Sequence, residues 1–197
     1  MFTLTERLEE EIEIDGEIYP LSLFFDVVLR FYDLMDDEEL VDEEKIEIAF
    51  EMFVDTEEEF DFETMFHSVQ AIVTTFIQPK EDEDSNNVGS GKKLYDLKQD
   101  AEYIYASFMQ EYGIDLLDQQ GILRWEKFKA LLSGLRDKTK FKEVVGIRAT
   151  ELPSGKGMED ERKRIRELQR IYALKKSHNE QEAELDAMFN ALVAGSR

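Results

Sequence analysis

Residues 61–78, DFETMFHSVQAIVTTFIQ, indicate the fold class of the chain. Apolar side chains recur at a spacing that places them on one side of a helix over four turns: Phe62, Met65, Phe66, Val69, Val73, Phe76 and Ile77. Asp61 is a preferred N-cap residue, and Pro79 directly after the segment cannot continue a helix. The segment therefore predicts one long amphipathic helix that covers a core.

Two other helices are expected between the N-terminus and this segment. The first begins near Leu21 or Ser22, where the Ser22 hydroxyl is a suitable cap, and ends in the acidic run 36–39. The second begins at Asp42, a good N-cap residue that is followed by acidic residues in the first turn. It is expected to bury one stripe of its surface, formed by Ile46, Ala49, Phe50 and Phe53.

Two segments lack a helical pattern. Within the first twenty residues, isoleucines alternate with charged residues on both sides of Asp15-Gly16, which predicts a β-hairpin with a tight turn. Residues 79–93, PKEDEDSNNVGSGKK, contain only Val88 as an apolar residue and are expected to form a flexible loop.

Amphipathic patterns continue after this loop. They predict a helix that ends before Gly113, a helix from Trp125, a short helix capped by Thr139, a basic helix over 158–176 and a last helix over about 179–194. The expected fold is therefore mainly α, a multi-helix domain with a small N-terminal β-hairpin.

The same patterns predict the domain organisation. We expect an acidic N-terminal region at 1–80, a flexible linker at 81–93, a helical region at 94–176 and an amphipathic tail helix at 177–197. These segments also fit one continuous domain, because no strong compositional break other than the linker separates them.

The chain is strongly acidic, with a net charge of −22 over 197 residues. The charge is uneven, since residues 1–84 contain 28 Asp and Glu against 4 Lys and Arg, whereas residues 85–197 contain 18 and 20. An acidic surface of this kind repels nucleic acid and attracts basic partners. Cysteine is absent, which excludes disulfides and thiolate metal sites, and neither a signal peptide nor an apolar run of membrane-spanning length is found.

Residues suited to catalysis are scarce. His67 and His178 are the two histidines; we expect His67 to be a partly buried structural residue and His178 to lie in a solvated connection. The segment 88–93 has glycines and lysines but lacks the spacing of a phosphate-binding loop, and Lys93 stands where a calcium loop beginning at Asp82 needs a glutamate. We predict a non-enzymatic protein, with no catalytic, cofactor-binding or metal-binding residues, that binds other proteins.

The basic segment 162–176 is the main exception to the acidic character of the chain. Its arginines and lysines could contact phosphates, but the net charge of the molecule opposes the approach of nucleic acid. We expect the segment to pair with the acidic N-terminal half or with an acidic partner.

The second half contains a characteristic order of aromatic, glycine and charged residues. It comprises LYDLKQDAEYIYASF at 94–108, YGIDL at 112–116, Trp125, Lys127-Phe128, Gly134-Leu135, Thr139-Lys140-Phe141 and Tyr172-Ala173-Leu174. With Ile14-Asp15-Gly16 and Glu43-Glu44-Lys45-Ile46, this order resembles the gene-product-fifteen family of bacteriophages and prophages of Gram-positive bacteria, over about residues 1–175. Family members commonly have two adjacent tryptophans where this chain has Arg124-Trp125, a difference that concerns local packing.

The resemblance implies a role in the morphogenesis of long phage tails. Proteins of this kind look like tail assembly chaperones, which bind the tape-measure protein, help to recruit tail-tube subunits and are absent from the finished virion. The host bacterial cytoplasm is the expected location, and neither nucleic acid nor a membrane is an expected partner. Two alternatives remain open, a structural virion protein of the tail or neck and an acidic inhibitor that imitates nucleic acid.

The last predicted helix lies beyond the region of resemblance. It carries Leu185, Met188, Phe189 and Leu192 at the spacing of an amphipathic helix that docks into an apolar groove. We expect it either to contact a partner or a second copy of the chain, or to fold back on its own core.

Overall fold

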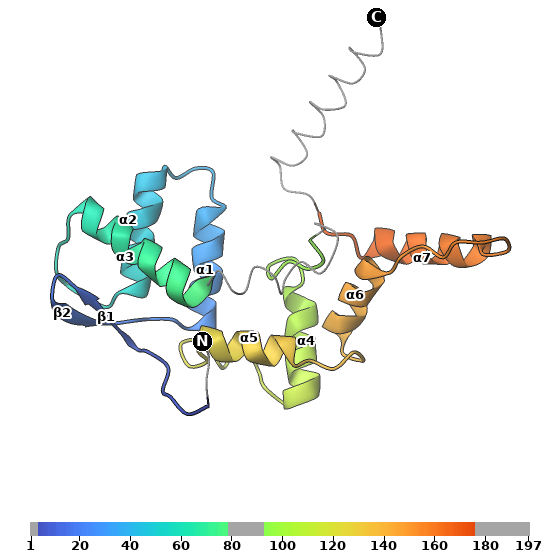
Figure 1. Cartoon of the computed structure of the whole chain (residues 1–197), viewed down its shortest axis with the longest axis horizontal. Helices are drawn as coiled ribbons and strands as arrows, with labels where there is room; N and C mark the ends of the chain where they lie inside the picture. The colour runs from blue at the N-terminus through green and yellow to red at the C-terminus, as the bar shows by residue number, and fades with distance from the viewer. Residues whose placement is uncertain (1–3, 79–92, 176–197) are drawn as a thin grey trace, which may run out of the picture.

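The computed structural model describes residues 4–78 and 93–175 of the chain (Figure 1). A two-stranded hairpin, β1 (Glu11–Ile14) and β2 (Glu17–Pro20), precedes α1 (Phe25–Met35), α2 (Asp42–Phe53), α3 (Phe62–Ile72) and the π-helical turn η1 (Val73–Ile77). The other part contains α4 (Ala101–Tyr112), α5 (Trp125–Ser133), α6 (Lys140–Ala149) and α7 (Glu159–Ile171). The prediction of a mainly α fold with a small N-terminal hairpin is therefore confirmed.

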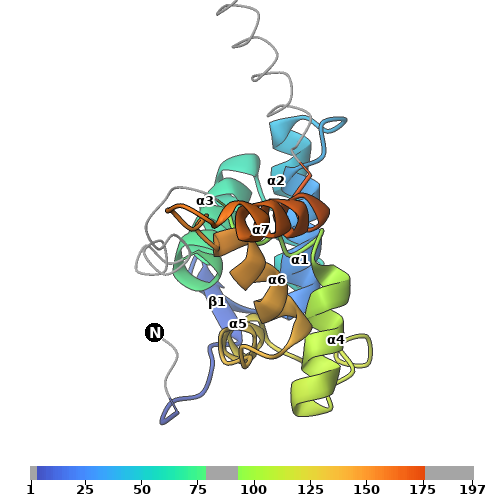
Figure 2. The ribbon, with the colours of Figure 1, turned by 90° about the vertical axis from the view of Figure 1, so that its right-hand side faces the viewer.

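The molecule is extended in one direction. The hairpin, α2 and α3 lie at one end of its long axis, α7 lies at the other, and α5 and α4 lie between them (Figure 1). Seen from the α7 end, this helix crosses in front of the rest of the molecule (Figure 2). Among the residues that the structure describes, no helix combines the length and apolar character needed to cross a membrane.

The hairpin turns at Asp15-Gly16, as predicted. Both residues have positive φ angles, 53° and 87°, which is the geometry of a two-residue type I′ turn. The strands pair in the register that places Tyr19 opposite Ile12, so the two side chains lie on one face. Tyr19 is therefore buried, whereas Ile18 points away and is 67% exposed.

The first helix begins later than the sequence predicted, because residues 21–24 are extended. Leu21 forms a β-bridge with Val54 and Phe24 forms one with Arg124, so this segment lies between two distant parts of the chain. The prediction that Ser22 caps the helix is wrong: its backbone N–H donates to the Phe53 carbonyl instead, at 2.8 Å. These tertiary hydrogen bonds hold the backbone straight until α1 begins at Phe25.

The helix at 61–78 begins as expected but does not stay regular. The Asp61 carboxylate accepts a hydrogen bond from the Thr64 backbone N–H at 3.0 Å, which confirms Asp61 as the N-cap. Beyond Ile72 the chain widens into η1, and the Thr74 hydroxyl donates to the Gln70 carbonyl at 2.8 Å. The wider turn places Ile77 in the core, where it is 3% exposed.

A backbone pairing joins the two parts of the chain. The Phe25 N–H donates to the Leu123 carbonyl and the Trp125 N–H donates to the Leu23 carbonyl, both at 2.9 Å. Arg124, between them, is 5% exposed, and its guanidinium donates to the Glu9 carbonyl at 2.6 Å and to the Glu126 carboxylate at 3.2 Å. The positive charge of Arg124 is thus buried with hydrogen-bond partners.

Aromatic rings next to this backbone pairing form part of the core. Phe128 is stacked against Phe25, Phe108 and Trp125, with centroid distances of 5.1, 5.3 and 5.6 Å. Trp125 also meets Tyr32 edge-on at 6.2 Å. The rings come from α1, α4 and α5, so one buried cluster extends across both parts of the described chain.

A buried ion pair organises the second part of the chain. The Arg148 guanidinium donates hydrogen bonds to both carboxylate oxygens of Asp100, at 2.6 and 2.7 Å. Asp100 is only 1% exposed. The same guanidinium donates to the Tyr172 carbonyl at 2.6 Å and to the Leu94 carbonyl at 3.1 Å. Arg148 therefore ties α6 to the start of α4, to the preceding segment and to the end of α7.

The N-terminus of α6 is capped from another helix. We expected the Thr139 side chain to cap it, but the Thr139 hydroxyl donates to the Arg136 carbonyl at 2.7 Å. The Phe141 N–H donates instead to the Ser107 hydroxyl of α4 at 3.0 Å, within the buried contact between α4 and α6. The helix begins where the sequence predicted, but a tertiary contact satisfies its free N–H group.

We predict that Arg148→Leu lowers the free energy of unfolding by about 3–5 kcal/mol, because it leaves the Asp100 carboxylate buried without its cation. The double variant Asp100→Leu/Arg148→Leu should recover a substantial part of this loss, since it removes both charges. Urea unfolding of the single and double variants measures both effects. If the double variant loses as much free energy of unfolding as the two single variants together, the pairing of Asp100 with Arg148 is contradicted.

We also predict that Trp125→Ala lowers the free energy of unfolding by about 3–5 kcal/mol, because it removes a ring from the centre of the aromatic cluster. Ile122→Ala is a matched control three residues away: Ile122 is 64% exposed, so its loss should cost no more than about 0.5 kcal/mol. Equal destabilisation by the two variants would show that the cluster is not central.

Candidate protein-interaction surfaces

The helix α7 lies against the molecule with only one of its sides. Its first turn contains Glu159, Asp160 and Glu161, whose carboxylates interact favourably with the positive end of the helix dipole. None of its residues is buried. Its half-buried Ile165 and Leu168 indicate the side that faces α6, the helix it contacts. The sequence prediction of an amphipathic basic helix is correct in this respect, but the helix ends at Ile171 and not at 176.

Polar contacts fix α7 along this inner side. The Gln169 amide donates to the Ile147 carbonyl at 3.1 Å and to the Thr150 carbonyl at 2.8 Å. At the end of the helix, the Lys140 ammonium donates to the Tyr172 hydroxyl at 2.9 Å and lies 4.7 Å from the centre of that ring. This hydrogen bond is the main reason why the pKa of Lys140 is raised. The helix is therefore held in one orientation.

The outer side of α7 carries three cations next to the exposed carboxylate of Glu167. Lys163, Arg166 and Arg170 follow each other at intervals of three and four residues, so they lie on one side of the helix. We call these three residues the basic face. Within the described chain, none of the three has an ion-pair partner, whereas Arg162 and Arg164 pair with glutamates of the same helix. The expected pairing of this segment with the acidic N-terminal half does not occur among the described residues.

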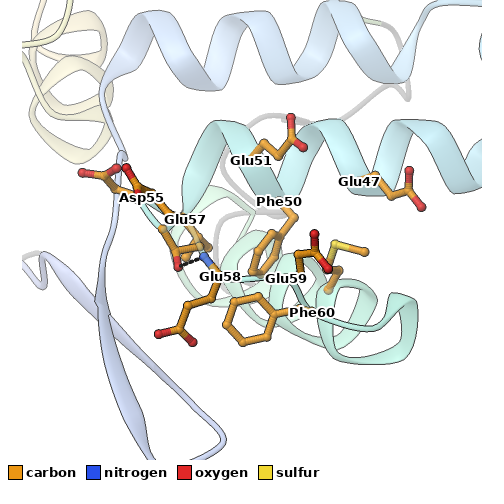
Figure 3. Close-up of a pocket in the computed structure, with 11 residues that line it drawn as sticks. Glu47, Phe50, Glu51, Asp55, Glu57, Glu58, Glu59 and Phe60 are labelled. Carbon is orange, nitrogen blue, oxygen red and sulfur yellow. Dashed lines mark hydrogen bonds between the residues drawn. The ribbon is translucent and has the colours of Figure 1, made fainter.

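A second feature lies at the other end of the molecule. Carboxylates surround a hollow of about 620 Å³ between α2, the chain at 54–60 and the start of α3 (Figure 3). Its lining residues, which we call the acidic hollow, are Glu47, Phe50, Glu51, Val54, Asp55, Thr56, Glu57, Glu58, Glu59, Phe60 and Met65. The rings of Phe50 and Phe60 meet edge-on at 5.3 Å and form an apolar floor beneath the carboxylates.

The carboxylates of the acidic hollow are not neutralised. Among the described residues, no Lys or Arg forms an ion pair with any of them. The Tyr19 hydroxyl donates to the Glu58 carboxylate at 2.8 Å and lies near Glu17. This hydrogen bond, followed by burial and the two negative charges, raises the pKa of Tyr19 to about 12. The hollow thus combines several carboxylates with an apolar base.

A pair of phenylalanines forms a third exposed feature, on α3. Phe62 and Phe66 are stacked with a centroid distance of 6.3 Å and are 41% and 39% exposed. The sequence pattern assigned both to the buried face. His67 follows them, and the prediction that it is partly buried is wrong: its side chain is 64% exposed and its Nε2 lies 3.9 Å from the Glu63 carboxylate.

The residues predicted as a partner contact, Leu185, Met188, Phe189 and Leu192, lie outside the described residues. Sequence reasoning missed the acidic hollow and the exposed phenylalanine pair. The spacing of Glu47 and Glu51 by one helical turn was a visible signal, but the path of residues 54–60 that completes the hollow was not.

Among the described residues, no group of three or more histidines and carboxylates could hold a metal ion.

A family model described as "Bacteriophage Gp15 protein" matches residues 4–174 of the chain. No curated protein and no solved structure matches it.

We predict that Glu58→Gln lowers the pKa of Tyr19, because it removes the charged acceptor that favours the protonated phenol. The raised pKa stabilises the fold while Tyr19 stays protonated, and this contribution is lost as the pH rises through about 12. The ultraviolet absorbance of tyrosinate during an alkaline titration measures the shift, with Tyr19→Phe identifying the signal. An unchanged titration in Glu58→Gln would contradict this geometry.

Proposed function

The chain belongs to the bacteriophage Gp15 protein family, and from this membership we propose that it acts as a tail assembly chaperone or morphogenesis factor of a long-tailed phage. The observation that carries the proposal is the family match over residues 4–174, nearly the whole described chain. The proposed role is non-enzymatic. It consists of binding the tape-measure protein, and also tail-tube subunits, in the host cytoplasm during tail assembly.

The exposed phenylalanine pair supports binding to an apolar partner. A tape-measure protein is expected to be long and helical with apolar stripes, which would aggregate unless another surface covers them. Phe62 and Phe66 offer two adjacent rings at the surface, and aromatic rings supply large contact area at interfaces. We propose that this pair covers part of an apolar stripe of the tape-measure protein.

The charge of the N-terminal half supports the solubilising part of this role. Residues 1–84 carry 28 acidic side chains, and many of those described are exposed around the hairpin, α2 and α3. A complex covered by this surface would carry a high negative charge, which favours solubility. The same surface contacts would also suit a structural protein of the tail or neck, which is the alternative function.

Co-expression with the tape-measure protein of the same phage tests the proposal. We predict that the tape-measure protein is soluble and co-purifies when this chain is present, and that it is insoluble when this chain is omitted. A tape-measure protein that stays insoluble in both cases would contradict the chaperone function.

The phenylalanine pair can be tested in the same assay. We predict that Phe62→Ser/Phe66→Ser weakens binding of the tape-measure protein by about thirtyfold or more, as expected for loss of a central aromatic contact. Leu117→Ser/Ile122→Ser is the control, because Leu117 and Ile122 are 65% and 64% exposed but lie in the loop before α5. Circular dichroism would verify that both variants are folded, and equal binding by both would overturn the proposed contact.

A further inference from the structure

The basic face and the acidic hollow cannot meet within one molecule. The hollow involves α2 and the start of α3, at one end of the long axis, and α7 lies at the opposite end (Figure 1). The contacts described above hold α7 against α6, away from α2. Among the described residues, each charged surface therefore lacks a partner in its own chain.

We propose that the basic face of α7 docks into the acidic hollow of a second copy of the chain, so that copies associate head to tail. The partner is inferred from charge complementarity. Three cations without ion pairs among the described residues are matched by a group of carboxylates that also lack them there, and both sets are present on every copy. This inference does not depend on the proposed chaperone function.

The charges on the two surfaces repeat at a similar interval. Lys163, Arg166 and Arg170 extend over about 10 Å, because an α-helix rises 1.5 Å per residue. Glu47 and Glu51 are separated by one turn of α2, and Asp55 follows two residues after the end of that helix. A helix laid along the hollow can therefore place several cations opposite carboxylates at once.

The floor of the hollow adds an apolar component. Phe60 is half-buried and contacts Phe50 and Tyr19 edge-on. The methylene stems of lysine and arginine cover apolar surface, and a guanidinium stacks favourably on an aromatic ring. Arg166 or Arg170 can thus contact the phenylalanine floor with its stem while its charge reaches a carboxylate on the rim.

This arrangement is a heterologous interface, since two different surfaces meet. Each added copy exposes a new basic face at one end and a new hollow at the other, so association continues into a chain or closes into a ring. The contact relies on exposed charges, and salt screens such charges beyond about 8 Å at physiological ionic strength. The association should therefore be weak and sensitive to salt.

Sedimentation velocity of the purified full-length chain tests the proposal. At low ionic strength we expect the average mass to rise with protein concentration, and at high ionic strength we expect a monomer. A monomer at every concentration and ionic strength would overturn the proposal. Because no other phage protein is present, this result is independent of whether the chain binds a tape-measure protein.

Charge-reversal variants locate the contact. Arg166→Glu/Arg170→Glu and Glu47→Lys/Glu51→Lys should each weaken self-association by about tenfold or more, because each reverses one side of the contact. Lys127→Glu/Lys138→Glu changes the net charge by the same amount as the first variant, at exposed positions outside α7. This control should retain most of the association, and an equal loss in it would overturn the proposal.

Mixing the two reversed variants gives the sharpest result. Each alone is expected to be monomeric, but the intact basic face of the second variant fits the intact hollow of the first. The mixture should therefore associate, and circular dichroism would verify that all variants are folded. A mixture that stays monomeric would overturn the proposal.

Discussion

The pairing of Leu23 and Phe25 with Leu123 and Trp125 is the interaction on which the rest of the structure depends. It joins segments about one hundred residues apart in a chain whose two parts differ strongly in charge. The two hydrogen bonds orient Trp125, so that its ring stacks on Phe128 and its indole N–H reaches the carbonyl of Ile77 at 3.4 Å. The start of α1, the end of η1 and the start of α5 are therefore defined by one contact.

This backbone pairing also determines where the interaction surfaces lie. Because α5 is fixed against α1, the helices that follow extend away from the acidic end (Figure 1). Arg148 then directs the end of α7 through its hydrogen bond to the Tyr172 carbonyl. The acidic hollow and the basic face are thus separated by the length of the molecule. Among the described residues, the two surfaces therefore do not pair with each other.

Local signals in the sequence predicted much of the fold. The Asp61 cap, the Asp15-Gly16 turn and the helix end at Gly113, which has a φ of 66°, each depend on neighbours a few residues away. The start of α1 and the cap of α6 were not predictable in this way. The backbone N–H of Ser22 donates to the Phe53 carbonyl, and the N–H of Phe141 donates to a serine of another helix. At both positions a tertiary hydrogen bond takes the place of the predicted side-chain cap.

The surfaces were harder to predict than the helices. An apolar stripe shows that a helix covers a core, but it does not show how much of the stripe the core covers. Phe62 and Phe66 follow the same spacing as Val69, yet they remain well exposed while Val69 is buried. The acidic hollow depends on the non-helical path of residues 54–60, for which the sequence contains no periodic signal. The basic character of α7 was visible, but its orientation follows from contacts with α6.

Mass spectrometry of infected cells and of purified particles tests the proposed assembly role most directly. A chaperone acts before the tail is complete, so we predict that the chain is abundant in infected cells and missing or scarce in finished phage particles. Its presence in particles at a fixed ratio to the tail proteins would contradict that role and would identify it as a structural component of the virion.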